Sequence, residues 1–278
     1  MADYLRPSSL DDALAALADR PWTMLAGGTD VYPANVGHPI TGDILDVTGL
    51  ATLRDISIDD GRVRIPALAT WTDIVRADLP PAFDGLKTAA RSIGGVQIQN
   101  RGTLAGNLCN ASPAADGLPN LIALGARVEL SSTAGRREVD VGEFVVGNRR
   151  TIRRPDELVT AILVPVPSPT ARSTFLKLGS RAYLVISIAS VAAVLDVGSD
   201  GRVTSARIVV GACSEVPRRI VAAEERLVGV VASSTLGGSI EAADLDLLSP
   251  IDDVRGTGAY RRDVATTLVR RAVSELSR

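Results

Sequence analysis

Several residue types that support common functions are scarce in this chain of 278 residues. The two cysteines, Cys109 and Cys213, are too few for a disulfide framework or for an iron–sulfur cluster within the chain. The single histidine, His38, excludes a histidine-rich metal site and leaves a Ser–His–Asp triad only one candidate base. We therefore expect no metal site. Aromatic residues make up only 3% of the chain, so Ala, Val and Leu must fill most of the core.

Concentrated charge and long apolar runs are also missing. The chain has 30 basic and 32 acidic residues, a formal net charge of −2, and no long run of either sign. This balance argues against nucleic acid or an anionic membrane as a partner. The pairs Arg149-Arg150 and Arg153-Arg154 are interpreted as solvated faces or turn residues. No run reaches 18 apolar residues and the first residues do not resemble a secretory signal, so we predict a cytoplasmic protein without a transmembrane segment.

The order of apolar and turn residues predicts many short elements. Either Ser8 or Ser9 is a candidate cap for an amphipathic helix that is predicted to end near Asp19. Residues 185–197 and 203–210 are predicted to form a long hairpin, and a last helix is predicted from Thr257. Three prolines in residues 165–169 cannot continue a helix or a central strand, so we place a domain boundary there.

Two glycine-containing segments carry the functional signal. Residues 26–30 follow a short strand and contain the pair Gly27-Gly28, whose backbone N–H groups can face a phosphate. Residues 97–110 show no period and are predicted to be a long polar loop before a helix capped by Ser112, with Pro113 first and Gly125 near its end. Each pattern alone is also compatible with an ordinary structural turn. Neither a Rossmann fingerprint nor a P-loop motif occurs in the chain.

Four blocks of sequence resemble a known family, in order and at the family's spacing. They are Leu25–Asp30, Ile93–Gly95, Gln97–Leu108 and Asn110–Asp116. The family is that of the FAD-binding medium subunits of xanthine dehydrogenase and aerobic carbon monoxide dehydrogenase. Smaller matches, such as Tyr4–Pro7, Phe175–Arg181 and Tyr260–Arg262, extend the resemblance along nearly the whole chain.

The resemblance implies an α+β fold. A FAD-binding domain of two α+β subdomains, of the vanillyl-alcohol-oxidase and p-cresol-methylhydroxylase type, is expected over residues 1–166. A C-terminal antiparallel sheet with helices, of the carbon monoxide dehydrogenase flavoprotein type, is expected over residues 170–278. The boundary agrees with the one indicated by the prolines.

The resemblance also implies the residues that contact FAD. They are Met24, Leu25, Ala26, Gly27, Gly28, Thr29, Asp30, Val31, Ile93, Thr103, Leu104, Ala105, Gly106, Asn107, Asp116, Val159 and Lys177. Lys177 would favour the anionic reduced flavin, although a solvated lysine on a strand is the alternative. Where family members commonly have two glycines, this chain has Ala105-Gly106, which is tolerated if only Gly106 needs a positive φ.

The function implied is that of an electron-transferring oxidoreductase subunit with no catalytic acid, base or nucleophile of its own. Partner chains would be a large subunit with molybdopterin and a small subunit with [2Fe-2S] clusters, in a dimer of heterotrimers. A stand-alone flavin oxidoreductase and an interaction subunit without FAD are the alternatives. Tyr183 is a candidate flavin neighbour, whereas Cys109 is interpreted as a small apolar filler. The organic substrate and the electron acceptor are not readable from the chain.

Overall fold

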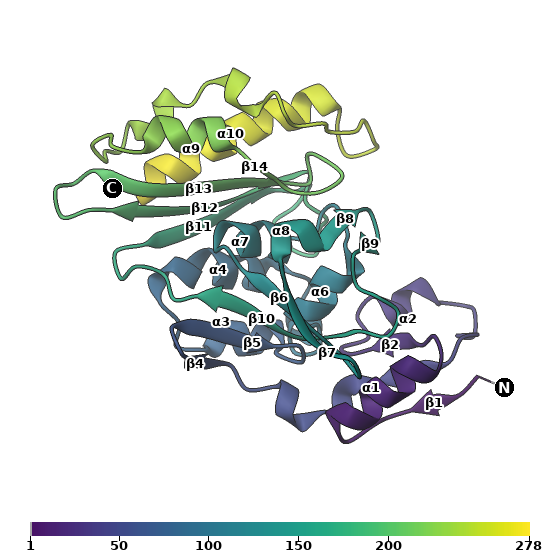
Figure 1. Ribbon diagram of the computed structural model, residues 1–278. Helices are drawn as coiled ribbons and strands as arrows, with labels where there is room; N and C mark the ends of the chain where they lie inside the picture. Colours follow the sequence, from purple (N-terminus) through teal and green to yellow (C-terminus); the bar gives the residue numbers. More distant parts are fainter. Residues whose placement is uncertain (1) are drawn as a thin grey trace.

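The structure is a computed structural model that describes residues 2–278, and its sheets follow one another along the chain (Figure 1). The first sheet is parallel and has the order β1-β3-β2, with β1 at Tyr4–Leu5, β2 at Thr23–Leu25 and β3 at Ile44–Asp46. Helix α1 (Leu10–Asp19) begins as predicted, because the Ser9 side chain accepts a hydrogen bond from the Asp12 N–H.

The second sheet is antiparallel and forms the centre of the N-terminal part. Its strands, in spatial order, are β4 (Ser57–Asp59), β5 (Arg62–Pro66), β10 (Leu158–Pro165), β6 (Arg127–Ser132) and β7 (Gly135–Asp140). All residues of β10 except Pro165 are buried, as expected for a central strand. The β5 and β6 partners of Ile162, namely Ile65 and Val128, are fully buried beside it.

Helices connect and cover these strands. They are α2 (Val31–Ala34), α3 (Trp71–Arg76), α4 (Asp84–Ser92), α5 (Val96–Gln99), α6 (Leu104–Asn110), α7 (Gly117–Ala123) and α8 (Val141–Phe144), and α8 is followed by a small ribbon of β8 (Val145–Gly147) and β9 (Arg150–Thr151). Short 3-10 helices cover Val47–Gly49, Ala51–Leu53, Pro81–Phe83, Leu236–Ser239 and Ala242–Leu245.

The third sheet is antiparallel and begins after the proline-rich segment. Its order is β11 (Arg172–Leu178), β12 (Ala189–Val197), β13 (Val203–Gly211) and β14 (Arg218–Arg219). Figure 1 shows α9 (Val221–Leu227) and α10 (Gly258–Leu276) above this sheet, and α4 and α7 below it. The C-terminal sheet is thus packed between two layers of helices, which confirms the predicted α+β fold with a C-terminal antiparallel sheet.

Three predictions of local structure are wrong. Residues 97–110 are not one loop, because they contain most of α5 and the whole of α6. The helix predicted to start at Pro113 begins only at Gly117, and Ser112 instead accepts a turn hydrogen bond from the Ala114 N–H. The first strand of the C-terminal hairpin begins at Ala189, so residues 185–188 precede it as irregular chain. Within residues 2–278, no helix is long and apolar enough to cross a membrane.

Candidate functional site

A cleft of about 480 Å³ brings most of the expected FAD contacts together. Both glycine-containing segments line it, although they are about 75 positions apart in the sequence. The expected residues on its walls are Met24, Ala26, Gly27, Gly28, Thr29, Asp30, Val31, Ile93, Thr103, Ala105, Gly106, Asn107 and Val159. Of the other expected residues, Leu25 and Leu104 are buried beneath the walls, and Asp116 and Lys177 lie elsewhere.

The first segment forms a turn between β2 and α2 that can hold an anion. Among the described residues, the backbone N–H groups of Gly27, Gly28 and Thr29 have no hydrogen-bond acceptor. Gly28 has a φ of +72°, a left-handed backbone conformation that residues with a side chain rarely adopt. Successive N–H groups around a left-handed residue form a concave site that favours phosphate.

Gly27 lets the two segments touch. A Cβ atom at Gly27 would lie 1.9 Å from the backbone oxygen of Arg101, closer than atoms can approach. The absence of a side chain therefore allows the turn at residues 26–30 to pack directly on the chain before α6. This contact explains why one cleft has walls from both segments.

The second segment supplies a helix start instead of a flexible loop. Thr103 is the N-cap of α6, and its side-chain oxygen accepts from the Gly106 N–H at 2.9 Å. Gly106 lies inside this helix and is not among the glycines with a positive φ, so the tolerance of Ala105 does not depend on that condition. The helical backbone also explains why alanine is compatible with position 105, where the side chain is 4% exposed.

Asn107 carries a polar atom without a partner. Its side-chain oxygen is buried and accepts no hydrogen bond from the described residues. Buried polar atoms without a partner are rare in folded proteins, because their desolvation is not offset. Asn107 lines the cleft, and a rotation of its side-chain amide would bring this buried oxygen to a hydroxyl or N–H donor of a bound molecule.

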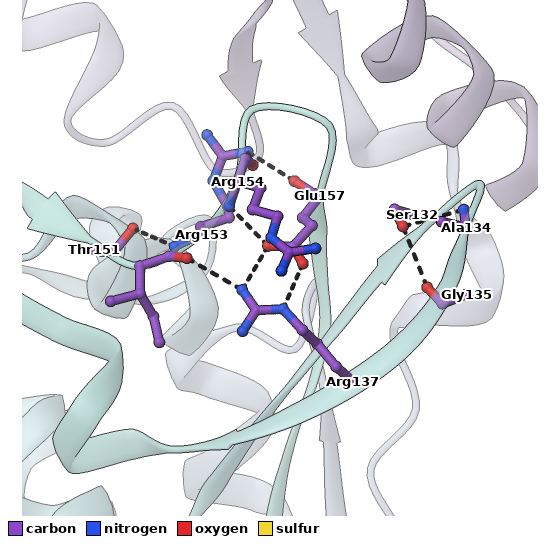
Figure 2. Close-up of polar contacts among 9 residues, drawn as sticks. Ser132, Ala134, Gly135, Arg137, Thr151, Arg153, Arg154 and Glu157 are labelled. Carbon is purple, nitrogen blue, oxygen red and sulfur yellow. Dashed lines mark hydrogen bonds and ion pairs between the residues drawn. The ribbon is translucent and has the colours of Figure 1, made fainter.

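Two arginines on the cleft wall were not predicted as site residues. Arg149, which has a φ of +59°, and Arg153 both line the cleft, so their interpretation as solvated or turn residues is incomplete. Figure 2 shows Arg153 beside the part-buried Arg137–Glu157 ion pair, and the Arg153 guanidinium donates to the Glu157 carbonyl at 2.7 Å. The Arg149 guanidinium donates to the Asn110 side chain. Two arginines therefore line the same cleft as the turn at residues 26–30.

Asp116 and Lys177 form a buried ion pair near the cleft. The Lys177 ammonium donates to Asp116 Oδ2 at 2.8 Å, and the Ser187 hydroxyl donates to Asp116 Oδ1 at 2.7 Å. The side chains of Lys177 and Asp116 are only 12% and 6% exposed. Gly117, the residue after Asp116, packs against Asn107 and Trp71 of the cleft wall. The interpretation of Lys177 as a solvated lysine is therefore wrong.

The remaining candidates differ in their surroundings. Cys109 is exposed and lines the cleft, so it is not an apolar filler of the core. Tyr183 is 69% exposed, in the irregular segment between Lys177 and Ser187. His38 is also exposed. Among residues 2–278, no group of three or more His, Cys, Asp or Glu side chains could hold a metal ion.

The cleft fits the cofactor implied by the sequence. An elongated dinucleotide needs an anion site for its diphosphate, apolar walls for its rings and polar partners for its hydroxyls. The turn at residues 26–30 provides the first, Ile93 and Val159 provide apolar wall, and the unpartnered Asn107 oxygen is a polar partner.

Comparison with known proteins agrees with this geometry. Residues 1–167 match the family described as the FAD binding domain in molybdopterin dehydrogenase, and residues 174–276 match the CO dehydrogenase flavoprotein C-terminal domain. The chain is 32% identical over 235 residues to the nicotinate dehydrogenase FAD-subunit of Eubacterium barkeri, covering 82% of this chain and 79% of that protein. It is 31% identical to the glyceraldehyde dehydrogenase medium chain of Sulfolobus acidocaldarius, covering 99% and 98%.

A solved structure shows the same fold. The structure of reconstituted CO dehydrogenase from Oligotropha carboxidovorans contains a chain that matches with a TM-score of 0.91 and 28% identity, covering 100% of this chain and 98% of the other.

Proposed function

This chain belongs to the family of FAD-binding subunits of molybdopterin dehydrogenases, and on that premise we propose that it passes electrons from a [2Fe-2S] partner subunit to an external acceptor. As the FAD-binding medium subunit of a molybdenum hydroxylase, it is part of an oxidoreductase. The observation that carries the proposal is the cleft between the two glycine-containing segments, with its turn of free N–H groups.

The chemistry of the cleft residues indicates which part of FAD each would hold. FAD, when bound, supplies the capacity to exchange electrons singly or in pairs. The N–H groups of Gly27, Gly28 and Thr29 would hold its diphosphate, and Arg149 and Arg153, which line the same cleft, would offset part of its negative charge. The Asn107 side-chain oxygen would accept a hydrogen bond from the cofactor.

Asp116 and Lys177 would act at the flavin end of the cleft. A lysine ammonium near a flavin favours the negatively charged reduced ring, and its carboxylate partner limits this effect. The chain would bind, orient and tune the cofactor without a catalytic acid, base or nucleophile of its own.

The partners follow from the relatives, which are named as an FAD-subunit and a medium chain of dehydrogenases. We expect this chain to assemble with a large molybdopterin subunit and a small [2Fe-2S] subunit, in a dimer of heterotrimers. The test is purification of the affinity-tagged chain from its own cells, with metal analysis and sedimentation to give the mass. Recovery of both partners supports the assignment, whereas a chain recovered alone that turns over an organic substrate would favour a stand-alone flavin oxidoreductase.

Electron transfer needs a separate measurement. Reduced [2Fe-2S] subunit is added without oxygen to the FAD-loaded chain, and the flavin absorbance is followed. Bleaching that requires the iron–sulfur subunit is the expected result. A flavin that stays oxidised in the assembled complex would contradict the proposed direction of electron flow.

A further inference from the structure

A second cleft, of about 310 Å³, adjoins the FAD cleft and has a different character. It shares Ala26, Gly27 and Thr103 with the FAD cleft. The residues that distinguish it are Arg6, Arg54, Arg101, Tyr32, Asn100 and Asp46, and both Arg54 and Arg101 are exposed. We call it the arginine cleft.

Positive charge exceeds negative charge in the arginine cleft. Its one carboxylate, Asp46, already accepts from the Tyr4 hydroxyl and the Thr48 N–H, and pairs with Arg6 at 3.7 Å. Arg54 donates only to the Thr48 carbonyl, at 3.2 Å. Within residues 2–278, neither Arg54 nor Arg101 has a carboxylate within ion-pair distance. Two guanidinium groups around one small space repel each other, and an anion between them removes that cost.

The neutral groups of this cleft are donors. The side-chain oxygen of Asn100 accepts from the Thr72 hydroxyl at 2.6 Å, which leaves the Asn100 amide N–H groups to donate. Tyr32, which is 57% exposed, offers a hydroxyl and the face of its ring. Guanidinium, amide and phenol donors together match the oxygens of a phosphate.

A tight contact lies where the arginine cleft adjoins the FAD cleft. Gly27 packs so tightly on the Arg101 carbonyl that not even a methyl group fits between them. Arg54 and Arg101 line only the arginine cleft, whereas the FAD cleft has arginines of its own, Arg149 and Arg153. At about 310 Å³, the cleft is at the small end of ligand sites, too small for a second dinucleotide.

We propose that the arginine cleft binds a small phosphate-bearing anion, in addition to the FAD of the neighbouring cleft. The shared chemistry is a phosphate group held by Arg54 and Arg101, and it can belong to a free phosphate or pyrophosphate ion or to a mononucleotide whose base stacks on Tyr32.

The test is calorimetric titration of the FAD-loaded full chain with inorganic pyrophosphate and, separately, with AMP. The variants are Arg54→Gln and Arg101→Gln, and Arg76→Gln is the matched control because Arg76 is exposed and lines neither cleft. Each cleft variant should weaken binding about tenfold or more, as expected for a lost charge-assisted hydrogen bond. The control should bind like the unaltered chain, and the flavin absorbance should stay the same in all variants.

The results distinguish a free phosphate ion from a mononucleotide, and they distinguish failure of this proposal from failure of the proposed function. Tighter binding of AMP than of pyrophosphate assigns a mononucleotide, and the reverse order assigns free phosphate. Absence of binding by the FAD-loaded chain, or binding unchanged in both cleft variants, would overturn the proposal. Loss of FAD from the unaltered chain would instead contradict the proposed function, so the two failures are distinguishable.

Discussion

At the scale of single residues, the unpartnered oxygen of Asn107 gives the sharpest test of a cofactor contact. Asn107→Leu removes a buried polar atom that has no partner in the fold, so the stability of the FAD-free chain should stay unchanged or rise. The same variant should weaken FAD binding by about 0.5–1.5 kcal/mol, the usual net value of one hydrogen bond. Thermal unfolding and an FAD titration provide the two measurements.

Asn120 is the matched control for this prediction. It is 3% exposed, and its amide donates to the Asp116 carbonyl at 2.9 Å, so it is buried and satisfied. Asn120→Leu should therefore destabilise the FAD-free chain by about 1–3 kcal/mol. If Asn107→Leu destabilises the chain equally and leaves FAD affinity unaltered, Asn107 has a structural role only.

Asp116 and Lys177 require a double variant, because each is the partner of the other. Asp116→Ala alone leaves a buried ammonium unpaired and should cost about 3–5 kcal/mol of stability. Asp116→Ala combined with Lys177→Met should recover most of that loss, since neither charge remains. The double variant should nevertheless bind FAD about 1.5–3 kcal/mol more weakly, if the pair contacts the cofactor. Wild-type affinity in the double variant would remove both residues from the proposed site.

The sequence predicted Lys177 only through the family resemblance, and it did not predict the pairing of Lys177 with Asp116. Spacing alone cannot bring Asp116 and Lys177 together, because 61 positions separate them and the contact depends on how α7 packs on the C-terminal sheet. Arg149 and Arg153 were missed because arginines near a turn are usually solvated. The signal that could have found them is their position on either side of β9, in the segment that leads to β10, the strand that carries Val159 to the cleft.

At the scale of elements, ion pairs on the central sheet predict how stability depends on pH. Hydrogen bonds from Arg137 hold the pKa of Glu157 below its ordinary value of 4.5, and those from Arg64 do the same for Glu129. A lowered pKa in the folded chain contributes stability above the ordinary carboxyl pKa, and this contribution is lost as pH falls through the lowered value. We expect the melting temperature to fall steeply below about pH 4.5.

Glu157→Gln tests the source of this acid sensitivity. Glutamine cannot ionise, so the variant should be less stable at neutral pH, while its melting temperature should vary less between pH 5 and pH 3. An acid profile parallel to that of the unaltered chain would show that other carboxyl groups control acid unfolding.

The elements themselves were predictable where a pattern was long enough. Helix α1 has a cap and a clear apolar face, and the sequence located it correctly. Helix α5 has four residues and α6 has seven, too few for a helical period to stand out from a polar segment. Their formation depends on packing, in which Leu104 and Leu108 are buried against the N-terminal core.

At the scale of the whole molecule, the division into residues 1–166 and 170–278 stays a proposal. Residues 168–170 are exposed, and β10 and β11 on either side belong to different sheets. Limited proteolysis should cut there first. The two fragments should stay together, because Phe175 packs against Ala89 and Ala123 from the other side of the boundary. Early cleavage elsewhere, or immediate separation of the fragments, would contradict the proposed division.

The central claim is that the cleft between the two glycine-containing segments holds FAD, and a blocking variant tests it most directly. Thr29→Trp fills the cleft from its wall, whereas Thr133→Trp places the same side chain in the exposed turn between β6 and β7. The measurement is the amount of flavin released from each purified, FAD-saturated protein per mole of chain. We expect equimolar FAD in the unaltered chain and in Thr133→Trp, and almost none in Thr29→Trp. The FAD-free form of Thr29→Trp should stay folded. Equal flavin in all three proteins would contradict the central claim.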